Sequence, residues 1–343
     1  MTPLRIATYN VEWFNALFDD AGRLLDDDGW SGRQDVTRAE QTAGLVTVFR
    51  ALDADAVLVV EAPDDNRRRS TVRALETFAA AAGIRARRAI LGFPSDTEQE
   101  IALLYDPDRL TPRHDPQGDG QTDDRAPRFD GTFRIDLDID AMLDVVTFSK
   151  PPLELACTTA GGREFRMIGV HVKSKAPHGA RTPDQAKRIA IANRRKQLAQ
   201  CIWIRQRVEE HLARGDSLIV LGDFNDGPGL DEFEHLFGRS GVEIVMGLDG
   251  GSHPELHDPH ARLAMSGKLA AQPVSARFYQ PDRRCYLSAL LDYVMVSSDL
   301  MAARPVWRIW HPFDDPAIWR DEALREALLV ASDHFPVSVD LAL

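Results

Sequence analysis

The sequence has few cysteines and no long apolar segment, and both absences limit what the protein can be. Its 343 residues include three widely separated cysteines, Cys157, Cys201 and Cys285. Disulfide frameworks are dense and even-numbered, so we expect reduced thiols in a cytoplasmic protein. No apolar run is long enough to span a membrane, so we expect no stable membrane association. The first residues lack the basic and apolar segments of a secretory signal.

Basic residues are in the minority as well. Lysine and arginine number 41 against 53 aspartates and glutamates, which gives a net charge of −12. Proteins that bind nucleic acid without sequence preference usually have a basic face, so any such face here must be local. Residues 162–197 are the best candidate, because they contain many cations and few carboxylates. Within them, residues 194–196 are expected to form a solvated helix face.

The hydrophobic fraction of 44% is ordinary for a globular protein, so one domain over residues 1–343 can bury an ample core. Apolar patterning predicts strands at residues 4–10, 55–62, 85–91, 101–105, 143–149, 153–159, 164–172, 217–224, 290–297 and 335–343. Helical spacing predicts helices at about residues 36–52, 69–83, 184–214, 230–237 and 320–329. Gly- and Pro-rich stretches predict loops at 106–131 and 247–283. Strands and helices do not alternate strictly, which favours two packed sheets with helices outside them.

Several of the predicted strands end on polar residues. Each of these residues alone is typical of a solvated loop or a turn. Together they form a chemically coherent set: carboxylates suit Mg²⁺, histidines carry protons near neutral pH, and amides bind oxygen without adding charge. Such a set is suited to hydrolysis of a phosphate ester. Its members are Asn10, Glu12, Glu61, His171, Asp223, Asn225, Asp292, Asp333 and His334.

The order and context of these residues resemble a known family. The segments "IATYNVEWF", "VVEA", "VHVKSK", "LGDFND", "LLDYVMVS" and "SDHFPV" are similar, in this order, to the motifs of the endonuclease/exonuclease/phosphatase superfamily, especially its deoxyribonuclease-like members. The resemblance covers residues 4 to 342. It implies an α+β fold with four layers: two mostly antiparallel β-sheets packed face to face, with helices on both outer faces.

The resemblance also implies a metal site. Glu61 matches the glutamate that binds the catalytic Mg²⁺ or Mn²⁺, and Asn10 and Glu12 match the residues that support that site. Asp333 stands at the position of a secondary metal ligand. Many members have glutamine before the metal-binding glutamate, where this chain has Val60. That difference changes a neighbour of the ligand and leaves the ligand itself in place.

Five further residues match catalytic positions of the superfamily. Asp223 matches the aspartate that orients or deprotonates the attacking water, and Asn225 matches an amide that contacts phosphate. His334 matches the histidine beside the scissile phosphate, and Asp292 the carboxylate that orients it. His171 stands where deoxyribonuclease-like members have histidine and abasic-site endonucleases have tyrosine.

Three lysines are candidates for phosphate binding. Lys173 and Lys175 follow His171 at spacings of two, so all three side chains would point to one side if the strand continued. Lys150 is a further candidate. Trp13, beside the metal motif, is a candidate for the mouth of the site. His253, His257 and His260 lie among glycines and prolines, where we expect a solvated loop and no zinc site.

These observations predict a divalent-metal-dependent phosphodiesterase, with an endonuclease-like action on DNA or RNA as the first hypothesis. A phosphatase or phosphodiesterase for small or lipid phosphates, of the inositol phosphate or sphingomyelinase type, is the alternative. No stretch like the Trp-Cys-Asp-Arg of inositol phosphatases is present. A catalytically inactive binding module is the alternative of another class, although no expected site residue is missing. We expect nucleic acid as the partner and no obligate protein partner.

Overall fold

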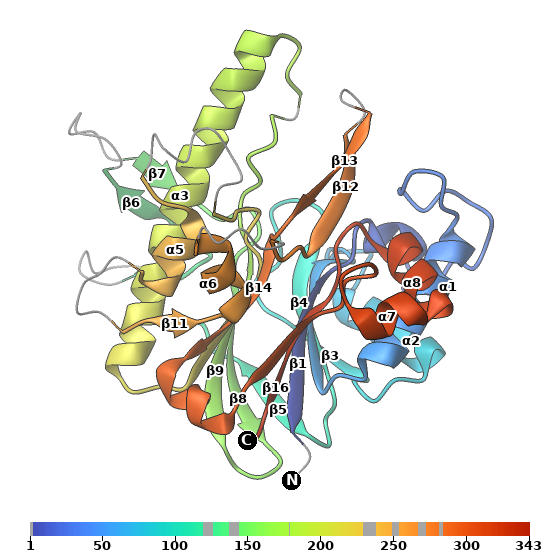
Figure 1. Ribbon diagram of the computed structural model, residues 1–343, viewed down its shortest axis with the longest axis horizontal. Coiled ribbons are helices and arrows are strands. Elements are labelled where there is room, and N and C mark those ends of the chain that lie inside the picture. Colours follow the sequence, from blue (N-terminus) through green and yellow to red (C-terminus); the bar gives the residue numbers. More distant parts are fainter. Residues whose placement is uncertain are drawn as a thin grey trace.

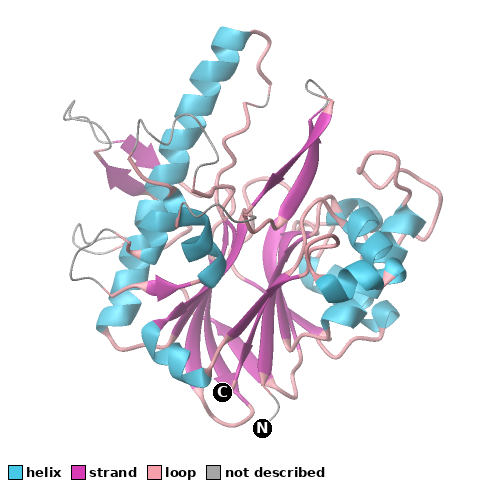
Figure 2. Cartoon of the chain, viewed as in Figure 1, coloured by secondary structure: helices cyan, strands magenta, loops and turns pink. Residues whose placement is uncertain are grey.

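The computed structural model describes residues 3–118, 126–136, 144–177, 179–228, 238–248, 254–266, 272–280 and 284–343. Two six-stranded sheets lie face to face, with helices outside each of them (Figures 1 and 2). The predicted four-layer sandwich is therefore confirmed. Among the helices of the described residues, none is long and apolar enough to cross a lipid bilayer. The predicted helix at 230–237 lies outside the described residues.

The first sheet contains both ends of the described chain. Its central strands β1 and β2 are parallel, and the other neighbouring strands are antiparallel. In spatial order its strands are β15 (Val306–Ile309), β16 (Val337–Leu341), β1 (Leu4–Asn10), β2 (Ala56–Ala62), β4 (Glu100–Tyr105) and β3 (Arg88–Leu91).

The second sheet has the same plan, with one parallel pair, β9 and β10, among antiparallel neighbours. In spatial order its strands are β11 (Leu256–His257), β14 (Asp292–Ser297), β10 (Leu218–Asp223), β9 (Glu164–His171), β8 (Leu153–Thr159) and β5 (Leu110–His114). "Mostly antiparallel" therefore describes both sheets correctly.

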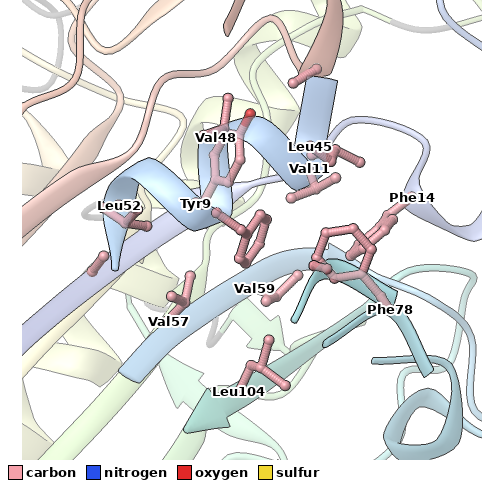
Figure 3. Close-up of a cluster of buried hydrophobic side chains, with 14 of the residues drawn as sticks. Tyr9, Val11, Phe14, Leu45, Val48, Leu52, Val57, Val59, Phe78 and Leu104 are labelled. Carbon is pink, nitrogen blue, oxygen red and sulfur yellow. The ribbon is translucent and has the colours of Figure 1, made fainter. Parts of the chain in front are cut away.

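The alternation of side chains along each strand builds three apolar layers. In β2, Leu58 points into the core between the sheets, whereas Val57 and Val59 point to the outer helices. Figure 3 shows part of that outer cluster, in which Phe14 and Phe78 pack beside β2. The outer helices of the first sheet are α1 (Arg38–Leu52), α2 (Thr71–Ala82), α7 (Pro316–Arg320) and α8 (Glu322–Ala331).

On the other side, the second sheet packs against α3 (Pro183–Ala213), α5 (Gly241–Met246) and α6 (Pro259–Met265). The 31-residue helix α3 has Thr182 as its N-cap and proline at its first position, both typical of a helix start. Its buried residues begin at Arg194, so the first part of the helix extends past the sandwich (Figure 1).

Two predicted loops contain regular structure. Strand β5 lies within 106–131 and includes Pro112, which an edge strand tolerates because one of its sides is unpaired. The region 247–283 contains β11, α6 and β12 (Ala276–Gln280), and His260 lies in α6. His253 lies outside the described residues. The loop predictions were wrong at these places because Gly and Pro content does not exclude an edge strand, a strand paired in a hairpin or a short capped helix.

The described residues also form two small hairpins and two short 3-10 helices. Strand β12 pairs with β13 (Cys285–Ala289), and β6 (Phe133–Ile135) pairs with β7 (Asp144–Val146). The 3-10 helices are η1 (Phe14–Leu17) and η2 (Ser298–Ala303). In Figure 1 the β12–β13 hairpin and the first half of α3 both extend beyond the end of the sandwich that lies opposite the two chain termini.

Candidate active site

One end of the sandwich collects the predicted residues because the strand directions require it. Asn10 ends β1 beside the last residues of β2, and Asp223 ends β10 beside His171 of β9. Asp292 begins the antiparallel strand β14 and is paired with Asp223. The two sheets meet here, because Asn10 Nδ2 donates to Asp223 Oδ2 at 3.0 Å across a separation of 213 residues.

Asp223 is the centre of this cluster. Its Oδ1 accepts the backbone N–H of Asn225 at 2.7 Å, and its Oδ2 accepts Asn225 Nδ2 at 3.2 Å. Asn225 has φ of +49° and also donates to the carbonyl of Val172 at 3.0 Å. Burial raises the pKa of Asp223 to about 7, and the charge of Asp292 acts in the same direction. Asp223 is therefore a fixed carboxylate poised to exchange a proton near neutral pH.

His334 forms a buried pair with Asp292. Its Nδ1 lies 2.7 Å from Asp292 Oδ2, which also accepts Ser275 Oγ at 2.8 Å. Burial alone would lower the pKa of His334, but the carboxylates of Asp292, Asp223 and Asp333 raise it well above its ordinary value. The imidazolium is thus the favoured form, with Nδ1–H held by Asp292.

The other nitrogen of His334 faces the rest of the cluster. Nε2 lies 4.0 Å from Asp223 Oδ2 and 4.0 Å from Asp333 Oδ1. Both distances exceed a hydrogen bond, so the Nε2–H donor is not used by either carboxylate. It is available to an oxygen that enters between them.

Glu61 and Glu12 supply further buried carboxylate charge. Glu61 has φ of +59° at an irregularity of the β2–β4 ladder, and Gln99 Nε2 donates to its Oε2 at 2.6 Å. Burial and the charge of Asp333 raise the pKa of Glu61, and the same two causes raise that of Glu12 to about 7. Arg33 forms an ion pair with Glu12 and offsets part of this effect.

This donor set fits a divalent cation. Burial is the main cause of the raised pKa values of Glu12, Glu61 and Asp223, and the charge of a neighbouring aspartate adds to it at each of them. Asn10 Oδ1 is buried and has no hydrogen-bond partner in the part of the chain that the structure describes. Ligand atoms of Asp223, Asp292 and His334 also lie within 4.8 Å of one another. Oxygen-rich sites of this kind suit Mg²⁺ and Mn²⁺.

His171 is a neutral member of the cluster. Its Nε2 lies 3.7 Å from Asp223 Oδ2, and its Nδ1 is buried with no hydrogen-bond partner among the residues described. Burial lowers the pKa of His171 to about 3, and the charges of Lys150, His334 and Lys173 add to this effect. The two histidines of the site therefore differ in charge at neutral pH.

The three lysines are in different surroundings. Lys150 Nζ donates to Glu98 O at 2.7 Å, beside Gln99, and burial lowers its pKa. Lys173 is close enough to lower the pKa of His171 and Lys150. Strand β9 ends at His171, so the alternation expected through Lys175 does not continue.

Lys175 instead takes part in an ion-pair network beneath the Asp223 turn. Its Nζ donates to Asp226 Oδ1 at 2.8 Å, and Arg194 Nη1 donates to Asp226 Oδ2 at 2.6 Å. Arg194 is 1% exposed, so the expectation of a solvated face was wrong for this residue. Gln197, hydrogen-bonded to Arg194, donates to the carbonyl of Asn225 at 2.9 Å. This network supports the backbone of the turn from below.

The residues that orient the site were not found from the sequence. Gln99 contacts Glu61, Ser275 contacts Asp292, and Ser332 Oγ accepts the N–H of His334 while donating to the carbonyl of Asn10. The sequence around a serine or glutamine in a loop does not indicate that its side chain orients a catalytic residue. Trp13 is the candidate from the sequence for the mouth of the site. It lines a cavity of about 790 Å³, and Gln99 lines the same cavity.

Comparison with known proteins identifies the family and the fold. The sequence matches the Endonuclease/Exonuclease/phosphatase family over residues 7–334. No curated protein matches it. The solved structure of TDP2 from Caenorhabditis elegans is similar with a TM-score of 0.51 and 13% identity, over 98% of this chain and 74% of that chain. An endonuclease/exonuclease/phosphatase from Bacteroides vulgatus has a TM-score of 0.50 and 14% identity over 100% of both chains.

A family protein from Bacteroides thetaiotaomicron is similar to the same degree, with a TM-score of 0.50 and 14% identity over 99% of this chain and 97% of that chain. At such identities the likeness shows a shared fold. The family match spans nearly the whole sequence, and the chain belongs to the endonuclease/exonuclease/phosphatase family. It is thereby placed among hydrolases of phosphate esters, which typically use divalent metals.

Proposed function

We propose that this chain is a metal-dependent phosphodiesterase that hydrolyses phosphodiester bonds of nucleic acid, with Mg²⁺ or Mn²⁺ as cofactor. The observation that carries the proposal is the placement of His334. A protonated imidazole is fixed by Asp292 on one side, and its unused Nε2–H faces the gap before Asp223 and Asp333. A phosphoryl oxygen in that gap would receive a charge-assisted hydrogen bond as negative charge develops on it.

Asp223 supplies the base on the opposite side of the gap. Its pKa of about 7 allows it to accept a proton from an attacking water at neutral pH. The donors of Asn10 and Asn225 fix the position of its carboxylate, so a water bound to it is oriented as well. Neutral His171 lies beside it and can bind a non-bridging oxygen without adding charge, whereas Asn225 can do so only by giving up one of its two hydrogen bonds.

Glu61 would hold the metal, with Asn10 Oδ1, Glu12 and Asp333 as supporting ligands. When bound, a divalent cation acts as a Lewis acid that stabilises charge on the phosphoryl oxygens. The residues around it complete that stabilisation from the protein side. Lys173 and Lys150 lie near His171 and Glu61 and would bring a polyanion toward the site.

Support for a polymer substrate comes from the surface around the site. The exposed first part of α3 carries Lys187 and Arg188, for which no ion pair is found among the described residues. This arm lies on the same side as the catalytic end of the sandwich, as Figure 1 shows. A local basic arm can bind a phosphate backbone although the whole protein is acidic.

The proposal is tested with a panel of substrates in Mg²⁺. Supercoiled plasmid, single-stranded DNA, RNA, sphingomyelin and an inositol polyphosphate would each be incubated with the purified protein and with His334→Ala. We expect hydrolysis of at least one nucleic acid by the wild type, lost in the variant. Turnover of the lipid or inositol phosphate alone would support the alternative substrate class and contradict the nuclease proposal.

A further inference from the structure

The β12–β13 hairpin is attached directly to the candidate active site. The N–H of Arg277 donates to the carbonyl of Asp333 at 2.7 Å, and Ala276 forms a β-bridge with His334. Ser275, one residue before the hairpin, donates from its hydroxyl to Asp292. The position of the hairpin is therefore fixed relative to the residues proposed to carry out hydrolysis.

The hairpin presents aromatic rings to solvent. Tyr286 is 55% exposed and Tyr279 is 39% exposed, and their ring centroids lie 5.3 Å apart. They are directly paired across the hairpin in the β12–β13 register, and their ring planes meet at 62° in an edge-to-face arrangement. Exposed tyrosines are ordinary when isolated, but a fixed pair next to a reaction site is a surface on which a flat ring can stack.

Arg277 lies against this surface with unused donors. Its guanidinium carbon is 3.7 Å from the centroid of the Tyr286 ring and 5.4 Å from that of Phe313. Among the described residues, its side chain has no ion pair with a carboxylate and no hydrogen bond. Contacts on the faces of a guanidinium leave its N–H groups free, because these point outward in its plane. They can bind a phosphate with two parallel hydrogen bonds.

A cavity of about 500 Å³ joins these groups to the metal side of the site. Its lining combines four hairpin residues with two cations and three carboxylates in all: Arg277, Phe278, Tyr279 and Tyr286 from the hairpin, and Glu12, Arg33, Gln34, Asp35 and Asp333 from the rest of the chain. Its volume lies within the range of sites that bind small organic ligands, so it can accept one nucleotide unit. Arg33 is already paired with Glu12, which leaves Arg277 as the cation that can turn to a ligand in this cavity.

We propose that this cavity binds the nucleotide next to the scissile phosphate, with its base unpaired and stacked on the tyrosine pair and its phosphate held by Arg277. This inference rests on the proposed function and names its substrate class: single-stranded or locally unpaired nucleic acid. In a duplex, the neighbouring base pairs cover both faces of each base, so a side chain can stack on it only after it is unstacked. An unpaired base exposes its faces without that cost.

A binding assay tests this inference separately from the proposed catalytic activity. Dye-labelled single-stranded DNA, single-stranded RNA of the same sequence, the DNA annealed to its complement, and the strand with abasic residues would be titrated in Mg²⁺. Fluorescence anisotropy would follow binding to the His334→Ala background, which preserves the substrate. We expect single strands to bind more tightly than the duplex, and Tyr286→Leu to weaken single-strand binding by about 10-fold.

Matched variants identify the stacking contact. Tyr286→Phe keeps the ring and should bind the single strand as tightly as the His334→Ala protein does. Tyr286→Leu should bind the abasic strand as tightly as the His334→Ala protein does, because that strand has no base to stack. Arg277→Ala should weaken binding to the single strand and the abasic strand alike, because a phosphate contact does not need the base. Arg304→Ala is the control, since Arg304 is an exposed arginine beside the far end of the sheet and should leave binding unchanged.

Each outcome bears on one of the two proposals. Cleavage by the wild type together with equal binding by Tyr286→Leu would overturn the stacking site and leave the nuclease proposal intact. Tyr286-dependent binding of single strands without cleavage would overturn the nuclease proposal and support the stacking site. Tighter binding of the duplex, or an equal loss by Tyr286→Leu on the abasic strand, would overturn the assignment to an unpaired base.

Discussion

At the scale of single residues, the charges of the site depend on one another. Asp292 holds His334 in its charged form, whereas His171 stays neutral although it lies as close to Asp223. The difference has a structural cause, because Asp292 accepts a hydrogen bond from His334, whereas no carboxylate of the described residues accepts one from His171. One histidine can therefore donate a proton or stabilise charge, and the other can act as a neutral partner.

The first prediction concerns this pair. His334→Ala should lower kcat by about 10²- to 10⁴-fold, because it removes a donor that acts on the transition state. Asp292→Asn should also lose activity, since an amide supplies no charge to hold the imidazolium. Steady-state kinetics of the two single variants and the double variant would measure this. Groups that act as a unit are not additive, so the double variant should be little worse than His334→Ala.

The pH dependence of kcat is a second test of the His334–Asp292 pair. If protonated His334 is required, activity falls as pH rises through its pKa, which Asp292 raises. Removing that charge in Asp292→Asn lowers the pKa, so the alkaline limb of kcat should move to lower pH. A limb that stays in place, or losses that multiply in the double variant, would show that the two residues work independently.

The second prediction concerns protons and metal. Glu12 and Asp223 have pKa values of about 7 in the metal-free protein, so both bind protons as pH falls below that value. A cation competes with those protons, and its affinity should rise from about pH 6 to pH 8 with release of protons on binding. Isothermal titration calorimetry with Mn²⁺ in buffers of different ionisation enthalpy would measure both effects. An affinity independent of pH would contradict this assignment of the ligands.

At the scale of elements, the contact between β9 and β10 sets the distance from His171 to Asp223. Gly222, just before Asp223, has φ of +139°, and a Cβ atom there would overlap the carbonyl oxygen of Val170. Gly222→Ala should therefore cost about 3 kcal/mol or more in the free energy of unfolding, from overpacking and backbone strain together. Denaturant unfolding of the purified variant would measure this cost.

Gly215 is the matched control for that substitution. It lies in the turn before the same strand and has φ of +77°, but a methyl group added at its position would have no neighbouring atom within 4 Å among the described residues. Gly215→Ala should cost only the backbone strain, about 1 kcal/mol. Equal losses for the two variants would mean that the approach of Val170 to Gly222 carries no special constraint.

The elements also show what the sequence could and could not predict. Long periodic segments were predicted well: α3 and β10 lie within one or two residues of their expected bounds. Strand β5 was missed because Pro112 usually excludes a strand, and only its place at a sheet edge permits it. Strand β12 was missed because its own composition does not indicate a strand. Its pairing with β13 is what identifies it.

The same limit applied to the site. Residues at the ends of strongly apolar strands, such as Asp223 and His171, were recognised from pattern and resemblance. Ser275, Gln99 and Arg277 were not, because their roles arise from contacts between segments distant in sequence. The surroundings of Lys175 depended on where β9 ends, which the alternation of its sequence did not show.

At the scale of the whole molecule, the two sheets matter because each brings only part of the site. The first sheet supplies Asn10 and Glu61, and the second supplies His171, Asp223 and Asp292. The apolar layer between the sheets, with Leu58 and Leu221 among its members, holds the two halves in register. The charged cluster is buried at the end of this layer, so a cation there would neutralise charge that the fold has already brought together.

The most direct test of the central claim is metal-dependent hydrolysis at this cluster. Cleavage of single-stranded DNA and of bis-p-nitrophenyl phosphate would be measured with Mg²⁺ or Mn²⁺, with excess chelator, and after the metal is restored, for the wild type and Glu61→Gln. We predict activity with metal, its loss in chelator with the circular dichroism spectrum unchanged, and recovery on restoration. Glu61→Gln should need far more metal for the same rate. Full turnover in excess chelator, or a Glu61→Gln variant with the metal requirement of the wild type, would contradict the account.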